Sequence, residues 1–85
     1  MRLRQDGITW QEIDGELVIL DLDASQYLTT NSSGAFLAQF LGAERTADEI
    51  REALVAEYDI PTDVARRDAE AFVGELRDRG LLVEG

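Results

Sequence analysis

The dipeptide Asp14–Gly15 stands between two runs of strand-forming residues and restricts the fold of the N-terminal part of the chain more than any other feature. Asp-Gly is typical of a two-residue turn in which both residues have positive φ, and this turn joins adjacent antiparallel strands. The flanking runs are residues 8–13 (ITWQEI) and 16–22 (ELVILDL). The sequence therefore predicts a β-hairpin over residues 8–22.

Side-chain alternation divides the second of these strands into two apolar sets. Val18, Leu20 and Leu22 share one face of the strand. Leu17 and Ile19 lie on the other face, which we therefore expect to be partly covered as well.

A third strand is predicted at residues 26–30 (QYLTT), after a turn at 23–25. This segment carries neither a charged residue nor a proline, which are the usual devices that keep an edge strand from pairing with another chain. Alternation places Tyr27 and Leu28 on opposite faces, so that one belongs to the core and the other to an exposed groove. The question that follows is what pairs with the free side of this strand.

Three amphipathic helices are predicted in the remainder of the chain. Asn31 or Ser32 caps the first helix, a capping box at 46–49 (TADE) begins the second, and residues 60–63 (IPTD) open a third that ends at Gly80. The residues expected to face the core are Phe36, Leu37, Phe40 and Leu41, then Ile50, Ala53, Leu54 and Tyr58, and finally Ala65, Ala69, Phe72 and Leu76.

These elements together predict an α+β fold, in which a three-stranded antiparallel sheet is followed by three helices. The outline is winged helix-turn-helix-like, with the sheet placed first. A chain of 85 residues is long enough for one small domain and too short for two. We therefore expect a single domain over residues 1–85.

The composition argues against catalysis. The chain has no cysteine and no histidine, so the commonest nucleophile, general base and metal ligands are missing. Asp21 and Asp23 lack the central glycine and the distant glutamate of a calcium loop, so we expect two solvated acids that flank a turn. The acids of the second predicted helix fit a solvated face. We expect no catalytic residues, no metal site, no cofactor and no enzyme activity.

The charge and hydropathy patterns restrict partners and location. The chain has 18 acidic residues against 8 basic ones, which gives a net charge of −10. Nucleic-acid affinity comes largely from neutralising phosphates, so we expect no nucleic-acid binding. No apolar run approaches the ~20 residues that span a bilayer, and no signal peptide is recognisable at the N-terminus. These patterns predict a cytoplasmic protein without membrane contact.

A set of residues spread over nearly the whole chain follows a recognisable order and spacing. The set consists of Tyr27, Asn31 and Gly34, then Arg45–Thr46 and Glu49–Ile50, then Asp68, Phe72, Leu76, Gly80 and Leu81. This pattern resembles the PqqD-like family, whose members are peptide-recognition elements of pathways that make ribosomal, post-translationally modified peptides. The chain lacks the tyrosine–proline–glutamate–glycine signature of PqqD proper. It is more similar to the small stand-alone subunits of lasso-peptide clusters.

The resemblance implies a non-catalytic function. Relatives bind the leader region of a precursor peptide, which adds as a strand beside the third strand and lies in a groove against the third helix. They deliver the leader to a separate cysteine protease and, as a further candidate partner, to an ATP-dependent cyclase. Leaders of this class often carry a tyrosine and, three residues later, a proline.

The residues expected to line such a groove come from the third strand and from one stripe of the third helix. They are Gln26, Tyr27, Leu28, Thr29 and Thr30 on the strand, and Val64, Arg67, Asp68, Ala71 and Glu75 on the helix. Ala71 fits a widened core stripe almost equally well, and Arg67 and Asp68 also fit a surface ion pair that contributes little.

Three other functions stay open on the sequence alone. One is a peptide chaperone of another pathway of this kind or of a quinone-cofactor pathway. Another is an acidic winged-helix module for protein interaction or regulation, including a dimer formed through the same edge strand. The third is a DNA-binding winged helix, which the net charge opposes.

Overall fold

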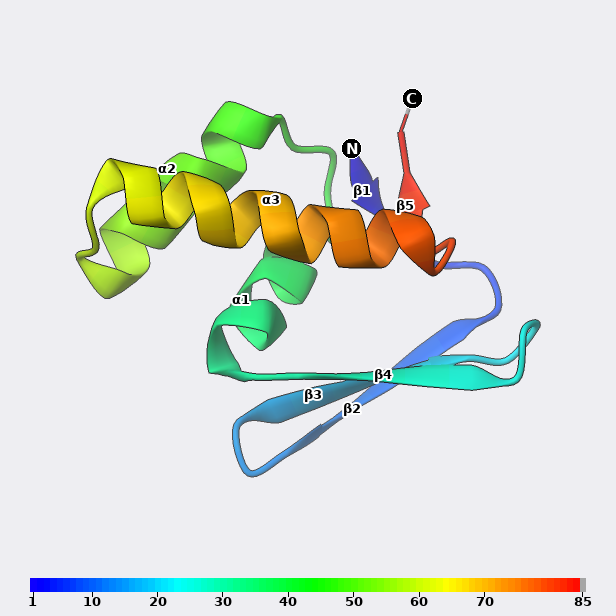
Figure 1. The fold of residues 1–85 in the computed structure, drawn as a ribbon. Helices are drawn as coiled ribbons and strands as arrows, with labels where there is room; N and C mark the ends of the chain where they lie inside the picture. The colour runs from blue at the N-terminus through cyan, green and yellow to red at the C-terminus, as the bar shows by residue number, and fades with distance from the viewer. Residues whose placement is uncertain (85) are drawn as a thin grey trace.

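A three-stranded antiparallel sheet carries three helices on one of its faces (Figure 1). The computed structural model describes residues 1–84. The elements in chain order are β1 (Arg2–Leu3), β2 (Ile8–Ile13), β3 (Glu16–Asp21), β4 (Gln26–Thr30), α1 (Ser32–Phe40), α2 (Ala47–Tyr58), α3 (Thr62–Asp78) and β5 (Leu82–Val83). The sheet has the order β2-β3-β4, so β4 lies at one edge. The α+β fold predicted from the sequence is confirmed.

The turn between β2 and β3 has the predicted geometry. Asp14 and Gly15 have φ values of 54° and 80°, and the register places Ile13 opposite Glu16. Positive φ at both positions is what a two-residue hairpin turn of this type requires. The turn therefore fixes the register of the whole β2–β3 pair.

The helices cover the side of β3 that carries Leu17 and Ile19. Leu17 and Ile19 are buried, whereas the alternating set is only partly buried within the strand. Leu22 lies beyond the end of β3 and is 63% exposed. The reason is the pairing with β4, which places Ile19 opposite Leu28 on the face that the helices cover. Alternation showed two apolar sets but not which of them the helices would meet.

The predicted helix N-termini are confirmed. The Asn31 side chain accepts a hydrogen bond of 2.9 Å from the N–H of Gly34 at the start of α1. Thr46 and Glu49 form both hydrogen bonds of the capping box at the start of α2, at 3.1 and 2.8 Å. These caps satisfy N–H groups that have no partner within their own helix.

The buried stripe of α3 differs from the predicted one at one position. Ala65, Ala69 and Leu76 are buried as expected, but Val73 completes the stripe, and Phe72 is only partly buried at its margin. The difference leaves the Phe72 ring beside α1, where it takes part in the site described below.

Tyr58, which the sequence placed in the buried stripe of α2, is exposed over 38% of its surface. Its ring packs edge-on against Phe36 of α1, with 5.8 Å between the ring centroids. Its hydroxyl donates to the carbonyl of Ser32 over 3.3 Å. Tyr58 thus connects the end of α2 to α1 instead of filling the core.

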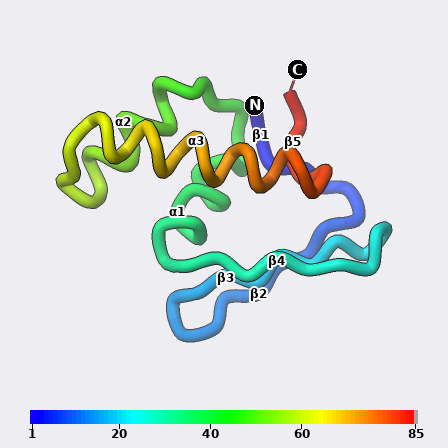
Figure 2. The backbone as a smooth tube through the Cα atoms, viewed as in Figure 1, coloured from blue at the N-terminus to red at the C-terminus, as the bar shows by residue number. Residues whose placement is uncertain are grey.

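The two ends of the described chain form a small ribbon that the sequence did not predict. β1 pairs antiparallel with β5, with Arg2 opposite Val83, close to the C-terminal end of α3 (Figure 2). Strands of two residues show no periodicity that a sequence pattern can reveal. Within residues 1–84, no helix combines the length and apolar character needed to cross a bilayer.

Candidate functional site

The outer edge of β4 is the first component of the site. β4 pairs with β3 on one side, and no strand pairs with its other side among residues 1–84. In an antiparallel ladder, successive residues direct their N–H and C=O groups alternately to the two sides. The question is therefore which residues of β4 direct these groups outward.

Two hydrogen bonds answer this question. The N–H of Leu22 donates to the carbonyl of Gly7 on the β2 side over 2.8 Å, so the even-numbered residues of β3 face β2 and the odd-numbered ones face β4. On β4, the carbonyl of Tyr27 accepts a hydrogen bond of 3.3 Å from Nη1 of Arg79, the residue that caps the C-terminal end of α3. Tyr27 and Thr29 therefore direct their backbone groups outward, while Leu28 bonds to β3.

Thr29 carries the free part of this edge. Its side chain is exposed, and within the described residues its backbone makes no hydrogen bond to a loop or a helix. An unpaired N–H and C=O on an exposed edge form a template for an extended peptide. Each hydrogen bond gained there contributes about 1 kcal/mol.

A cavity of about 330 Å³ begins where β4 ends. It lies between the first turns of α1 and the middle of α3, and the inner wall of the cavity reaches α2. Its lining consists of Asn31, Ser33, Gly34, Leu37, Leu54, Asp68, Ala71 and Phe72. The volume is at the lower end of the range for ligand pockets, and the lining combines polar groups at the rim with apolar groups in the depth.

Gly34 lines this cavity at a position where the neighbouring residues leave no room for a side chain. A Cβ at this position would lie 2.8 Å from Thr30 Cβ and 3.3 Å from Phe72 Cε1. Contacts below 3.0 Å between carbons require a shift of the backbone or of a neighbouring side chain. The absence of a side chain therefore lets the first turn of α1 approach both the end of β4 and the Phe72 ring.

The structure brings together only part of the predicted site. Asp68 and Ala71 line the cavity and are exposed, as a site at the surface requires. Val64 is partly buried and Arg67 is exposed, but neither lines it. Whether these residues bind a ligand stays a prediction.

The predicted residues of β4 separate into two groups. Leu28 and Thr30 are buried on the helix side, and the Thr30 hydroxyl donates to the carbonyl of Leu17 over 3.2 Å. Tyr27 and Thr29 are exposed, and Tyr27 keeps 65% of its surface in contact with solvent. The side chain of Leu28 thus belongs to the core, whereas the Tyr27 side chain lies on the face opposite the helices.

Arg79 connects the end of α3 to the beginning of β4. Besides its bond to the Tyr27 carbonyl, its Nε lies 3.0 Å from Glu75 Oε1, and its own carbonyl accepts from Gln26 Nε2 over 3.4 Å. Gln26 and Glu75, both predicted for the groove, are therefore engaged with Arg79. This network holds α3 alongside β4 and leaves the Thr29 end of the strand open.

A buried ion pair supports the corner that precedes β4. Asp21 is 3% exposed and lies 2.7 Å from Arg4 Nη2, and its carboxylate also accepts from the N–H of Ala24 over 3.2 Å. Burial raises the pKa of Asp21, but the hydrogen bond from Ala24 and the Arg4 guanidinium outweigh it and hold the pKa below its usual value. Asp21 is thus a structural anchor and not the solvated acid that the sequence suggested.

Six residues of the cavity were not among the site residues predicted from the sequence: Asn31, Ser33, Gly34, Leu37, Leu54 and Phe72. Helix periodicity assigned Phe72 and Leu54 to the core and explained Asn31 by capping alone. A signal for some of them was present, because Asn31, Gly34 and Phe72 belong to the pattern that resembles the PqqD-like family. The spatial meaning of that pattern appears only in the packing of α1 against α3.

Comparison with known proteins agrees with this architecture. The sequence model of the family described as "Coenzyme PQQ synthesis protein D (PqqD)" matches residues 16–82. No match was found among curated proteins. The family match spans β3 to β5 and therefore includes both β4 and α3.

Two solved structures are similar to the whole chain. One is described as "TbiB1 in Complex with the TbiA(beta) Leader Peptide"; it has a TM-score of 0.85 and 27% identity, and the alignment covers 100% of this chain and 98% of that one. The other is "Lasso peptide synthetase B1 complexed with the leader peptide", with a TM-score of 0.81, 28% identity and coverage of 98% and 96%. The family model matches most of the chain, and the protein therefore belongs to the PqqD family.

Proposed function

We propose that this protein binds the leader region of a ribosomally made precursor peptide, without chemically changing it, in the biosynthesis of a lasso peptide. Similarity over full length to two domains whose structures contain a leader peptide supports this function. The observation that carries the proposal is the unpaired outer edge of β4 beside the cavity lined by Asp68, Ala71 and Phe72.

The edge of β4 would supply the affinity for the peptide backbone. An extended leader segment pairs with the outward groups of Thr29 and with the N–H of Tyr27, whose carbonyl is engaged by Arg79. Main-chain pairing does not depend on peptide sequence, so it holds the leader without selecting it.

The cavity would supply the selectivity. A rigid side chain such as the tyrosine or the proline of the expected leader motif enters beside Ala71, whose small size leaves the space open. Rigid aromatic and cyclic side chains bury apolar surface at a low cost in conformational entropy. The polar groups of Asn31, Ser33 and Asp68 then lie within reach of a phenolic hydroxyl or of the peptide backbone.

Delivery to the maturation enzymes is compatible with this binding mode. A domain that holds the leader by one strand leaves the rest of the precursor free for a leader-cleaving cysteine protease and for an ATP-dependent cyclase. The chain has no histidine or cysteine of its own for acyl chemistry. We therefore infer that it acts as a binding subunit.

Calorimetry tests the function. A synthetic leader peptide that carries a tyrosine and, three residues later, a proline is titrated into the purified protein, and the mixture is then analysed by mass spectrometry. We expect saturable binding at a ratio of one to one and unchanged masses of both components. Absence of binding, or cleavage or modification of the peptide by this chain alone, would contradict the proposal.

A further inference from the structure

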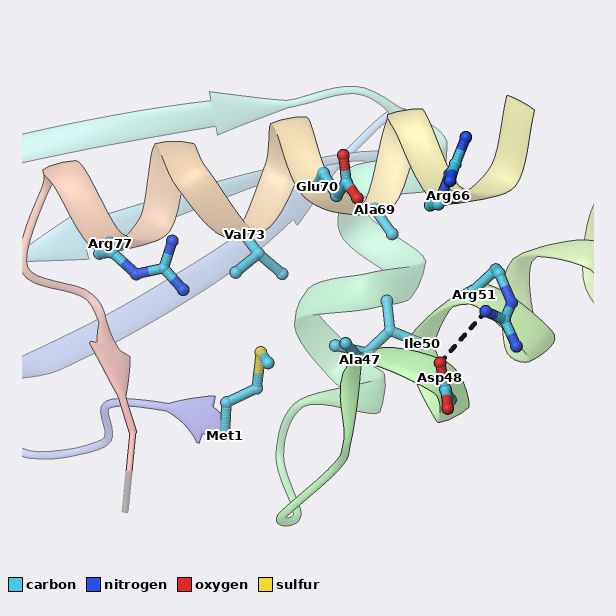
Figure 3. Close-up of a pocket in the computed structure, with 10 residues that line it drawn as sticks. All are labelled: Met1, Ala47, Asp48, Ile50, Arg51, Arg66, Ala69, Glu70, Val73 and Arg77. Atoms are coloured by element: carbon cyan, nitrogen blue, oxygen red, sulfur yellow. Dashed lines mark hydrogen bonds and ion pairs between the residues drawn. The ribbon is translucent and has the colours of Figure 1, made fainter. Parts of the chain in front are cut away.

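A second cavity, of about 290 Å³, lies on the other side of α3, between this helix and the first turns of α2 (Figure 3). Its apolar floor is formed by Met1, Ala47, Ile50, Ala69 and Val73. Figure 3 shows Ala69 and Val73 directed from α3 toward the gap and Ile50 directed toward it from α2. The α3 residues that line this cavity are Arg66, Ala69, Glu70, Val73 and Arg77. This spacing places them on one side of the helix, opposite the side that carries Asp68 and Ala71.

The charge around this floor differs from that of the rest of the molecule. The chain has a net charge of −10 and eight basic residues, all of them arginine. Three of these arginines, Arg51, Arg66 and Arg77, line the second cavity, together with only two acids, Asp48 and Glu70. The rim therefore gathers three of the eight arginines of a strongly acidic protein.

The rim arginines are available to an incoming carboxylate. Arg66 has no ion-pair partner among residues 1–84. Arg51 pairs over 3.1 Å with Asp48 and lies 3.9 Å from Glu52, and the side chains of both acids are mostly exposed. Exposed pairs of this kind contribute about 0–1 kcal/mol. Exchanging such a carboxylate for one from a partner protein therefore costs little.

The end of the chain shows the chemistry that suits this rim. After the aliphatic residues Leu82 and Val83, the Glu84 carboxylate binds Arg77 through two hydrogen bonds of 2.6 and 3.2 Å. Both side chains of this pair stay about half exposed. An arginine guanidinium matches the geometry of a carboxylate in this two-bond arrangement. A segment with aliphatic residues next to an acid therefore offers apolar groups for the floor of the second cavity and a carboxylate for its rim.

We propose that the second cavity is a docking site for a segment of a partner protein in which one or two aliphatic side chains are flanked by carboxylates. The aliphatic groups cover Ala69 and Val73, and the carboxylates bind Arg51, Arg66 and Arg77. This inference goes beyond the proposed function and does not depend on it. Because the two cavities lie on opposite sides of α3, both sites can be occupied at the same time.

A selection from a displayed library of random dodecapeptides tests the proposal. The library is first depleted on the double variant Arg66→Glu/Arg77→Glu and then selected on the unmodified protein. Both substituted residues are exposed, so the fold is retained, as circular dichroism will verify. We expect the retained peptides to share an aliphatic residue flanked by aspartate or glutamate. Failure to retain any peptide, or a consensus without acidic residues, would overturn the proposal.

Two neighbouring arginines provide a matched control for one retained peptide, labelled for fluorescence anisotropy. Arg66→Glu should weaken its binding on the order of tenfold, because it replaces an attraction by a repulsion. Arg67→Glu makes the same change in net charge but lies outside the second cavity, and it should leave binding within about twofold, as expected for a distant screened charge. Equal effects of the two substitutions would exclude the second cavity as the docking site.

Two further measurements separate this proposal from others. The double variant Arg66→Glu/Arg77→Glu should bind the leader peptide as the unmodified protein does, which shows that the two sites are independent. Light scattering of the unmodified protein should show a monomer at micromolar concentration. An oligomer that Arg66→Glu dissociates would identify the cavity as a contact between two copies of this chain and would overturn the assignment to a partner.

Discussion

The two sides of α3 have cavities of similar volume, about 330 and 290 Å³, but very different chemistry. The side near β4 combines an unpaired strand edge with one acid, Asp68, and the small residue Ala71. The side near α2 combines an aliphatic floor with three arginines. The comparison suggests that backbone pairing dominates recognition on the first side and charge complementarity on the second. One helix can therefore contribute to two sites of different kinds.

Filling the first cavity should have the largest effect on this comparison. Ala71→Trp places a bulky ring where a leader side chain is expected, and overfilling of a packed site costs about 1–3 kcal/mol or more. We expect leader affinity to fall by about tenfold or more, and binding of the acidic peptides at the second cavity to stay unchanged. Fluorescence polarisation with labelled leader measures the first effect. A folded Ala71→Trp protein with unmodified leader affinity would place the leader elsewhere.

Proline substitution along β4 should separate binding from folding. Thr29→Pro removes an N–H that is directed outward, so the fold should survive. Leader binding should weaken by about 1–3 kcal/mol, because one backbone hydrogen bond is lost and its acceptor in the leader stays desolvated. Leu28→Pro is the matched control, because it removes an N–H that bonds to β3 and should destabilise the domain itself. Circular dichroism and leader titration of both variants measure the difference. If folded Thr29→Pro binds the leader normally, strand addition at this residue is excluded.

The sequence predicted some parts of this site and not others. Local signals sufficed for the hairpin turn at Asp14–Gly15, for β4 and for the caps of α1 and α2, because each depends on neighbouring residues alone. The direction of the Thr29 backbone groups did not follow from the sequence, since it depends on register and on the bond from Arg79 to Tyr27. Alternation with a period of two showed which side chains of β4 share a face. It did not show which of its backbone groups bond to β3 and which are directed outward.

Contacts between distant segments explain the remaining differences. The sequence suggested that Asp21 is a solvated acid, because its partner Arg4 lies far away along the chain, in the connection between β1 and β2. Helix periodicity assigned Phe72 to the core, because the pattern within one helix cannot show that the ring packs beside Gly34 of α1. Both cavities are formed by segments that meet only in the folded chain, so neither could be derived from the spacing within one segment.

The ion pairs that support the two sides should respond differently to acid and salt. The Arg77 guanidinium holds the pKa of Glu84 below its usual value, and the pKa of Asp21 is lowered as described above. A carboxyl whose pKa is lowered on folding stabilises the protein at neutral pH, and this stabilisation is lost as the pH falls below about 4.

We expect Asp21→Asn to reduce the pH dependence of stability in this range more than Glu84→Gln does. The Glu84 pair is half exposed and is screened by salt, whereas Asp21 is buried beside Arg4. Urea unfolding at several pH values, with and without 1 M salt, measures both effects. An equal loss of pH dependence in the two variants would show that burial does not distinguish the pairs.

Removal of the positive charge of Arg67 should have the smallest effect on leader binding. Arg67 is exposed and does not line the cavity, so Arg67→Ala should lower leader affinity by less than about 1 kcal/mol. The remaining effect should disappear in high salt, because exposed charges are screened. A polarisation titration at low and high salt measures it. A large effect that persists in high salt would show that Arg67 contacts the leader directly, which would contradict its place outside the first cavity.

Amide hydrogen exchange of Thr29, followed by NMR, tests the central claim most directly. In the free protein this N–H is directed outward without a partner, so it should exchange rapidly, whereas the N–H of Leu28 is protected by its bond to β3. Addition of saturating leader peptide should slow exchange at Thr29 strongly and leave the amides that line the second cavity nearly unchanged. Rapid exchange at Thr29 in the saturated complex would contradict the addition of the leader as a strand along β4.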